Sequence, residues 1–386
     1  MKKITFYLFV AILSFGLSVS SCSEGDDAPD YSYGYIFTDV INSYVDNNIL
    51  VVYADLRDKA WILNDMVTAY SSNQSQENLN AVCAAWRAAR IPWEQSESFL
   101  YGPADLNGLD PSLDSWPLDK DAIDQLIRSN NSIKNAINSD ELRGFHTIEY
   151  LIFENGSSKT SALSAREVEY LVAVTEALRN DCVFLWASWN GPSGIPARDQ
   201  AVITSAGFDV GKGYVNEFRN AGTVNADIYI SQDDAIDEII DGCMTIAEEV
   251  GTQKIATPRD FAKQGDVERG RLEVESWYSF NSIDDYSNNI ISIQNSYMGG
   301  IEGKRGASLS DFVKSRNSAL DTKVRNAINK AYTAIYNDAT NSHSGMLYPF
   351  RDNLTGTKVD AAIAACVELS ETLSEIKTLR NVEIEE

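Results

Sequence analysis

The residues of this chain best suited to chemistry are a histidine and a glutamate three positions apart. His146 and His343 are the two histidines among 386 residues, and Glu149 follows His146 in a stretch whose apolar residues recur every three or four positions. This period predicts a helix on which His146 and Glu149 face the same way, one turn apart. An imidazole and a carboxylate so arranged can hold a metal ion together or hydrogen-bond each other. Gly144, two residues earlier, suits a close approach by another group because it has no side chain.

A purely structural role is the alternative for this pair. A histidine and a glutamate at this spacing occur often by chance, and a hydrogen bond between them would explain both residues. The segment also lacks the His-Glu-x-x-His pattern, in which two histidines bind zinc and the glutamate acts as the general base. That absence argues against an ordinary zinc protease. His343 lies in a run of Asn, Ser and Gly that predicts a loop.

Amphipathic helices are expected to position these residues. Proline is scarce, alternation of β-branched residues is rare and helical periodicity runs through most of the chain, which predicts an all-α fold. Besides the stretch around His146, helices are expected over residues 37–70, 76–90, 121–130, 164–188, 199–219, 233–250, 308–317, 319–338 and 358–379. The chain is longer than one hydrophobic core usually holds, and its clearest break is the Gly- and Pro-rich run after Asn190. We therefore predict two helical-bundle domains, over residues 36–190 and 191–386.

Two segments depart from the helical pattern. Residues 92–119 contain two tryptophans and four prolines, which predict a packed irregular connection of the kind that often carries binding residues. Within it, Glu94 and Glu97 would share one face of a helical turn, and for Glu94 we favour a solvated position. Residues 275–300 are polar and aromatic where a core helix would be apolar, so their polar groups need partners. A pocket at the surface or between the domains would supply them.

The N-terminus predicts export and lipid attachment. Residues 1–21 combine a short basic start with an apolar run, as a secretory signal peptide does. Val-Ser-Ser-Cys22 resembles a bacterial lipobox, at which the signal is removed and the cysteine is acylated. Residues 22–35 form an acidic tether that looks like the export signal of Bacteroidetes surface lipoproteins. We expect an outer-membrane lipoprotein exposed at the cell surface, with a periplasm-facing anchor as the alternative.

The net charge restricts the partners of the chain. A formal charge of −24 argues against nucleic acid and anionic lipid surfaces, which need cationic patches. Metal cations, cationic peptides and iron chelates remain compatible with it. The four cysteines beyond Cys22 lie in apolar, helical contexts without a Cys-x-x-Cys, so buried free thiols are expected and a cysteine metal site is not. A disulfide would form in an oxidising compartment if two of them faced each other.

Four ordered blocks of the sequence resemble the imelysin (insulin-cleaving membrane protease) family. They are Gly-x-His-x-x-Glu at 144–149 with Tyr-Leu-Ile-Phe after it, Trp-Arg-Ala-Ala-Arg-Ile-Pro-Trp-Glu-Gln-Ser-Glu at 86–97, Ser-Trp-Pro-Leu-Asp at 115–119, and the segment 279–299. The resemblance covers about residues 35–380. It implies an imelysin-like fold of two helical bundles, compatible with an internal duplication, with the motif histidine near their interface. It also implies a bacterial lipoprotein or periplasmic protein associated with iron or haem uptake.

Carried over by position, the resemblance marks His146 and Glu149 as metal or substrate ligands and Glu97 as the neighbouring carboxylate. Further candidates for the lining of the site are Gly144, Arg90, Trp116, Asp119, Ser279, Asn281 and Asp284. For Trp116, burial in the core is the simpler explanation.

The leading hypothesis is a non-catalytic lipoprotein that binds iron, or an iron complex, between two helical domains. An oxygen-rich site with one imidazole suits iron better than softer metals, and an outer-membrane receptor or iron transporter is the expected partner. The alternative is a metallopeptidase in which His146, Glu149 and another carboxylate hold zinc that activates water. The motif alone supplies two ligands, one short of a usual catalytic zinc site. A third hypothesis has no ion: the two side chains form a buried pair that pins the domains together.

Overall fold

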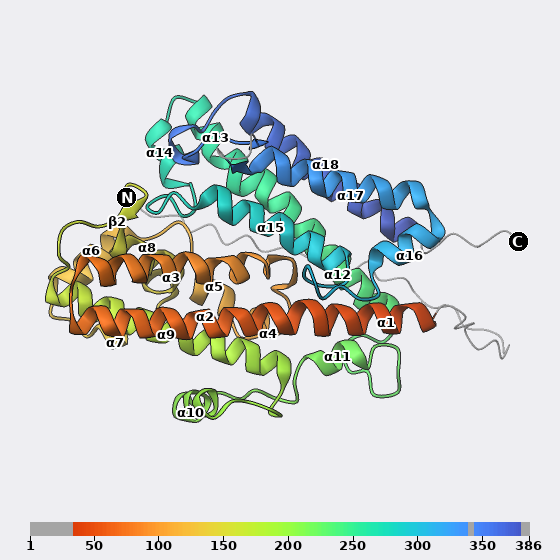
Figure 1. Cartoon of the computed structure of the whole chain (residues 1–386), viewed down its shortest axis with the longest axis horizontal. Coiled ribbons are helices and arrows are strands. Elements are labelled where there is room, and N and C mark those ends of the chain that lie inside the picture. The colour runs from red at the N-terminus through yellow and green to blue at the C-terminus, as the bar shows by residue number, and fades with distance from the viewer. Residues whose placement is uncertain (1–33, 339–342, 380–386) are drawn as a thin grey trace, which may run out of the picture. The chain divides into compact units, whose positions relative to one another are not determined.

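The computed structural model describes residues 34–338 and 343–379, and the chain from Gly34 onward forms one compact unit. The predicted signal peptide and Cys22 lie outside the described residues, as does the tether up to residue 33. The described strands are two short antiparallel pairs, β1 (Phe153–Glu154) with β2 (Ser157–Ser158) and β3 (Asn337–Asp338) with β4 (His343–Ser344). All other described elements are helical, so the predicted all-α fold is confirmed (Figure 1).

Four helices from the first half of the chain form one bundle. They are α2 (Leu50–Ser72), α3 (Gln76–Glu94), α8 (Gly144–Ile152) and α9 (Ala165–Asn190). Helix α2 packs along both α3 and α9, and α8 lies against the same two helices. Ser75 and Ser164 cap α3 and α9, each accepting a hydrogen bond from a backbone N–H in the first turn, and Glu167 completes a capping box. These caps define where the long helices begin. The buried apolar faces of the helices pack against one another and hold the bundle together.

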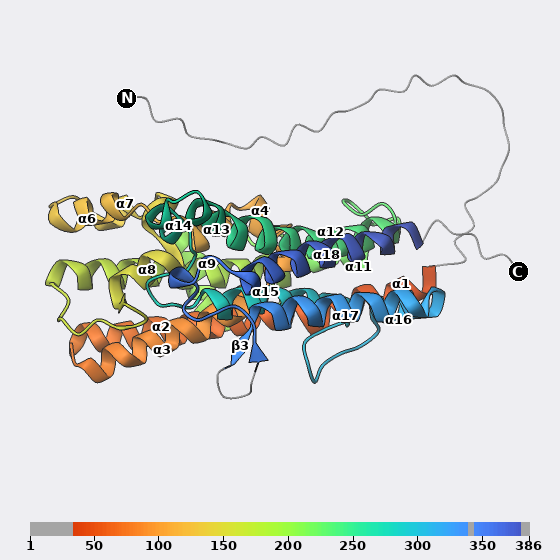
Figure 2. The ribbon, with the colours of Figure 1, turned by 90° about the horizontal axis from the view of Figure 1, so that it is seen from above.

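Four helices from the second half form the other bundle. They are α12 (Gln232–Glu249), α15 (Ser282–Tyr297), α17 (Ser318–Ile335) and α18 (Thr357–Leu379). Helix α18 packs along α12 and α17, and α15 contacts α12 and α17 as well (Figure 1, Figure 2). Ser231 caps α12 with a capping box of its own.

Shorter elements connect the bundles and cover their ends. The α-helices among them are α1 (Gly34–Tyr44), α4 (Pro103–Leu106), α5 (Leu109–Asp114), α6 (Lys120–Arg128), α7 (Ile133–Ala136), α10 (Ala197–Ala206), α11 (Val215–Arg219), α13 (Ala256–Lys263), α14 (Val267–Leu272) and α16 (Leu309–Arg316). Two π-helical turns, η1 (Val45–Ile49) and η4 (Val250–Ile255), and three 3₁₀ turns, η2 (Glu97–Phe99), η3 (Asp140–Leu142) and η5 (Phe350–Asp352), complete them. The segment predicted as an irregular connection contains short helical turns up to Asp114 and is irregular over residues 115–119.

Helices α1 and α15 tie the two bundles together. Helix α1 continues through η1 into α2, and it packs against α12 of the second bundle. Helix α15 packs against α3 of the first bundle, and its polar side chains find partners there: Asn289 donates a hydrogen bond of 2.5 Å to Oε2 of Glu94. The polar composition of residues 275–300 therefore belongs to a helix at the bundle interface. The domain boundary near residue 190 stays a prediction.

One predicted helix is wrong in its extent. Helix α10 ends at Gly207, whose left-handed φ of 70° closes the helix, so the expected helix over residues 199–219 is split. Gly211 and Gly213 also have positive φ and precede α11. In the described part of the chain, no helix combines the length and apolarity that a bilayer span requires.

Candidate metal centre

His146 and Glu149 hydrogen-bond each other on α8. Both side chains are fully buried, and Nδ1 of His146 lies 3.0 Å from Oε2 of Glu149. The other carboxylate oxygen, Oε1, accepts hydrogen bonds of 2.7 Å from both the backbone N–H and the hydroxyl of Ser279. Because both oxygens of Glu149 act as acceptors, Nδ1 carries a proton, and Nε2 is the ring nitrogen that remains for another partner.

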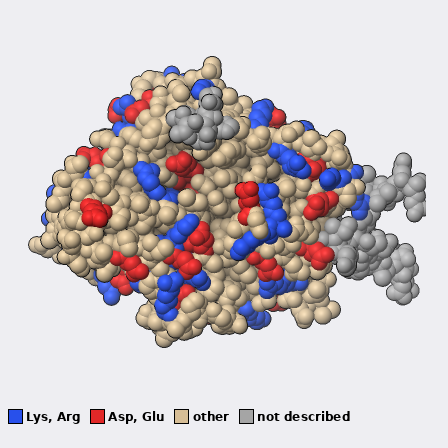
Figure 3. Space-filling view, in the orientation of Figure 1, with Lys and Arg blue, Asp and Glu red and all other residues tan. Residues whose placement is uncertain are grey.

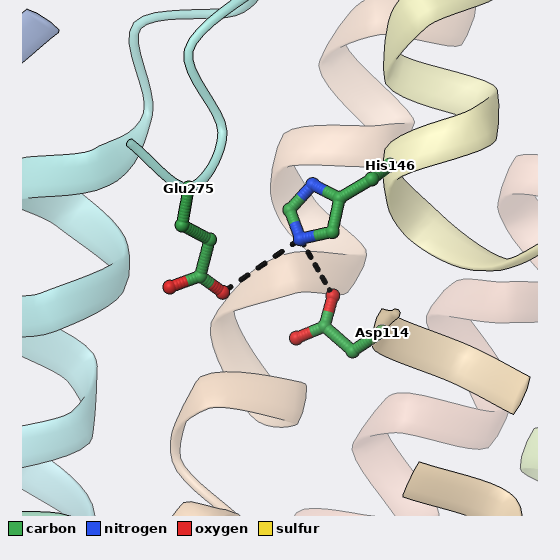
Figure 4. A group of neighbouring side chains, drawn as sticks. All are labelled: Asp114, His146 and Glu275. Atoms are coloured by element: carbon green, nitrogen blue, oxygen red, sulfur yellow. Dashed lines mark ion pairs between the residues drawn. The ribbon is translucent and has the colours of Figure 1, made fainter. Parts of the chain in front are cut away.

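Nε2 of His146 points toward two carboxylates that come from distant parts of the chain (Figure 4). It lies 3.1 Å from Oδ1 of Asp114, at the end of α5, and 3.7 Å from Oε1 of Glu275, in the connection between α14 and α15. Both are ion-pair distances, although neither contact has the angles of a regular hydrogen bond. The three ligand atoms lie within 4.8 Å of one another, close enough for one metal ion to bind them all.

The surrounding carboxylates also control the charge of the ring. Burial alone would lower the pKa of His146, but Asp114, Glu149 and Glu275 outweigh this effect and raise the pKa well above its usual range. For Asp114, burial would raise the pKa, but Arg90 and His146 lower it. Without a metal the site therefore holds an imidazolium beside a carboxylate, and a metal ion would bind by displacing that proton.

Arg90 is the central cation of this buried cluster. Its guanidinium is fully buried and pairs with Glu94 and Asp114, while Nη2 lies 3.0 Å from Glu275 and 3.3 Å from Asp285. The solvated position expected for Glu94 is wrong, because its side chain is 0% exposed and pairs with the arginine one turn earlier on α3. Burial raises the pKa of Glu94 well above its usual range, so this carboxyl holds a proton more readily than the others.

The cluster borders an open cleft of about 480 Å³, lined by residues from both halves of the chain. Its charged lining residues are Glu97, Asp110, Asp114, Glu249, Lys254, Glu273 and Glu275. Six of these seven residues are acidic, so the cleft attracts cations. By contrast, acidic and basic side chains are intermingled on the face shown in Figure 3. Burial and the charge of Asp114 raise the pKa of Asp110 to about 7. Trp116 also lines the cleft and packs edge-on against the ring of His146, with 4.8 Å between centroids.

Glu97 belongs to a second group of carboxylates, which shares Asp114 with the His146 group. Glu94 is the other member of this second group, and Nζ of Lys254 lies 3.5 Å from Oε1 of Glu97. The residues next to Nε2 are Asp114 and Glu275, so the structure does not group Glu97 with the histidine. A role for Glu97 as its neighbouring carboxylate stays a prediction.

The remaining candidate residues differ in their distance from the cluster. Asn281 donates a hydrogen bond of 2.7 Å to Asp285 and so supports the carboxylates around Arg90. Asp119 instead caps α6 by accepting a hydrogen bond from a backbone N–H. Asp284 is exposed on α15. The structure therefore brings Asn281 to the cluster and leaves Asp119 and Asp284 outside it.

Gly144 explains how α8 approaches Asp114. Its φ of 84° lies in the left-handed region, and a Cβ at this position would lie 2.5 Å from the carbonyl oxygen of Leu113. Because Leu113 directly precedes Asp114, the missing side chain lets the start of α8 pack onto the end of α5. The glycine of the motif thus helps to place the aspartate beside the histidine two residues later.

We expect Gly144→Ala to reduce both the stability of the protein and its affinity for a metal ion. The strained φ alone costs about 1–3 kcal/mol, and the overlap with Leu113 would push α8 away from Asp114. Urea denaturation and metal titration measure the two effects. Gly194→Ala is the matched control, since Gly194 has a φ of 72° but no atom within 4 Å of a Cβ. Equal losses in the two variants would contradict the role given to the contact with Leu113.

Sequence reasoning missed Asp114, Glu275 and Lys254. Asp114 had a local signal, since it precedes the Ser-Trp-Pro block, and Glu275 opens the polar and aromatic segment before α15. Neither sequence position indicates that its carboxylate lies beside His146. For Glu94 the local signal is weak: it stands four residues after Arg90 on the same predicted helix.

Comparisons with known proteins agree on one family. The family model of imelysin matches residues 49–376. The chain is similar to iron-regulated protein A of Synechococcus elongatus, with 27% identity over 284 residues that cover 74% of this chain and 70% of the relative. It is also similar to the crystal structure of an iron-regulated protein A precursor from Parabacteroides distasonis: 34% identity, TM-score 0.77, 89% of this chain and 94% of that one. An imelysin-like protein from Psychrobacter arcticum shares the fold at 14% identity, with a TM-score of 0.60 and coverage of 89% and 92%.

Proposed function

Because the chain belongs to the imelysin family, we propose that it serves iron acquisition by binding iron at the His146 site without catalysing a reaction. One observation carries this proposal: Nε2 of His146 is buried and lies 3.1 Å from a carboxylate oxygen of Asp114 and 3.7 Å from one of Glu275. The three atoms lie within 4.8 Å of one another, so a metal ion that displaced the Nε2 proton could bind all of them.

The donor atoms fit iron. His146 would contribute one imidazole nitrogen, and Asp114 and Glu275 would contribute carboxylate oxygens. Such a mixed nitrogen and oxygen set suits iron, whereas thiolate ligands would be expected for softer ions. The four cysteines beyond Cys22 are buried and free, as predicted, and none belongs to the cluster. Two similar proteins are named iron-regulated protein A, which supports an iron-related role for this chain.

Glu149 has the position of a supporting residue. It accepts a hydrogen bond from Nδ1–H of His146 and another from the backbone N–H of Ser279, which is the usual arrangement of a carboxylate that orients a metal-binding histidine. This differs from the direct ligand role expected from the motif. Because both of its oxygens are engaged, Glu149 is also poorly placed to act as the general base of a peptidase.

Lipid attachment belongs to the same proposal. We propose that Cys22 anchors the protein to the outer membrane, where the cleft would receive iron or an iron complex and pass it to an outer-membrane receptor or transporter. The lipobox-like sequence and the acidic tether support this. Fractionation of cells that carry Cys22→Ser tests it, because the variant should leave the membrane fraction.

The binding proposal is tested by calorimetric titration with ferrous ion under anaerobic conditions. We expect the wild-type protein to bind about one ion per chain through three protein ligands, and Asp114→Asn to bind at least about tenfold more weakly. Asp110→Asn is the matched control, because it removes an acidic residue of the same cleft that does not belong to the His146 group. Equal affinity in all three proteins would contradict the proposal. Cleavage of an insulin chain by the zinc-loaded protein would instead favour the metallopeptidase.

A further inference from the structure

Lys254 has an unusual position for a lysine. Its side chain is 11% exposed, and Nζ lies 3.2 Å from Oε2 of Glu275, 3.5 Å from Glu97 and 4.0 Å from Glu94. It projects from η4, and π-helical turns of this kind often occur at functional sites. A Cβ on Gly251 would lie 2.9 Å from Cys366 of α18, so η4 is pressed tightly against that helix. The packing of η4 fixes the backbone from which Lys254 projects, and the ion pairs hold its ammonium group in the wall of the cleft.

Glu275 links this lysine to the histidine. One of its oxygens, Oε1, lies 3.7 Å from Nε2 of His146. The other, Oε2, forms an ion pair of 3.2 Å with Nζ of Lys254. A cation on Oε2 reduces the negative charge that Oε1 can offer to a metal ion, and in a buried site this effect is larger than in water. The positive charge of Lys254, which lines the cleft, also repels a metal ion that enters from the cleft.

Resting on the proposed metal binding, we infer that Lys254 is a tethered counter-ion that lowers the affinity of the His146 site for its metal ion. Its charge stabilises Glu275 while the site holds no metal and keeps the bound ion exchangeable. A protein that receives and passes on iron needs such a moderated affinity. A lysine that only offsets buried carboxylates for folding would stabilise the protein without weakening the metal site.

The test is the dissociation constant for ferrous ion of the full-length protein and of Lys254→Met, measured by anaerobic calorimetry. We expect the variant to bind at least about tenfold more tightly, because one positive charge near the site is removed. Lys254→Arg retains the charge and should bind much closer to the wild-type affinity than Lys254→Met does. Lys330→Met is the matched control: it removes the same charge from a surface pair with Glu368 on α18 and should leave the affinity unchanged. Unchanged or weaker binding by Lys254→Met would overturn the inference.

The outcomes separate this inference from the proposed function. If wild type binds ferrous ion and Lys254→Met binds it no better, the inference fails and the proposed function stands. If only Lys254→Met binds the ion, the inference is supported and the proposed function of the wild type fails. Absence of binding in both proteins would overturn both. Should Lys254→Met fail to fold, Lys254→Gln, which also removes the charge and keeps a polar end group, provides the same comparison.

Discussion

Replacing His146 with glutamine is expected to abolish ferrous-ion binding and to leave the helical fold intact. Glutamine has a similar volume and can still hydrogen-bond Glu149, but its amide is a far weaker metal ligand than an imidazole. The affinity should fall by more than about 100-fold. Glu149→Gln should show an intermediate loss of about 10–100-fold, the usual effect of removing a carboxylate that orients a metal-binding histidine. Calorimetry measures the affinities, and circular dichroism verifies the fold.

Glu97→Gln is the informative comparison for this series. Glu97 lines the same cleft but is not grouped with Nε2 of His146, so we expect its replacement to weaken binding much less than His146→Gln does. A loss as large as that of His146→Gln would restore Glu97 to the ligand role assigned from the family motif. Unchanged binding in His146→Gln would show that the ion, if bound, lies elsewhere.

Arg90→Met is expected to cause the largest loss of stability of any single substitution proposed for this protein. The methionine would fill part of the same space, but it would lose the cation–π contacts with Trp86 and Phe145 and leave the carboxylates around the guanidinium without their cation. Removal of one partner from a buried ion-pair network costs about 3–5 kcal/mol, since the remaining charges stay away from water. Urea denaturation of the metal-free protein measures the change in the free energy of unfolding.

Arg198→Met is the control for this substitution. Arg198 is 51% exposed and pairs with Asp58 at 2.9 Å, and such surface pairs contribute about 0–1 kcal/mol. If Arg90→Met lost no more stability than Arg198→Met, the carboxylates of the cluster would have to be protonated and largely neutral in the native protein. That outcome would also weaken the argument that Asp114 and Glu275 are ready to bind a cation.

The helices could be predicted from the sequence more reliably than the site. Helices depend on interactions between residues close together in the sequence, whereas the site depends on contacts between distant segments. Helical periodicity and caps such as Ser164 act within a few residues, so the all-α fold could be read from local patterns. The contact between His146 and Glu149 follows from one helical turn. The predicted helix over residues 199–219 is too long, because the left-handed turn at Gly207 ends α10.

The ligand set could not be read in this way. Asp114 and Glu275 reach His146 through packing of α5 on α8 and of the second bundle on the first, and no periodicity encodes such contacts. The family resemblance included Arg90, which the structure pairs with Asp114 and Glu275, but it offered Glu97 as the carboxylate beside His146, where the structure has Asp114 and Glu275. The burial of Glu94 was missed because an isolated glutamate is usually solvated, and only the position of Arg90 between several carboxylates reverses that expectation.

We propose that Nε2 of His146 binds a metal ion together with Asp114 and Glu275. A crystal structure of the iron-loaded protein, with anomalous diffraction data collected on both sides of the iron absorption edge, tests it most directly. We expect one anomalous peak within bonding distance of Nε2 and of an oxygen from each carboxylate, while Glu149 keeps its hydrogen bond with Nδ1. A peak elsewhere, or no peak and a hydrogen bond from Nε2 to Asp114, would show that these three residues do not bind the ion together.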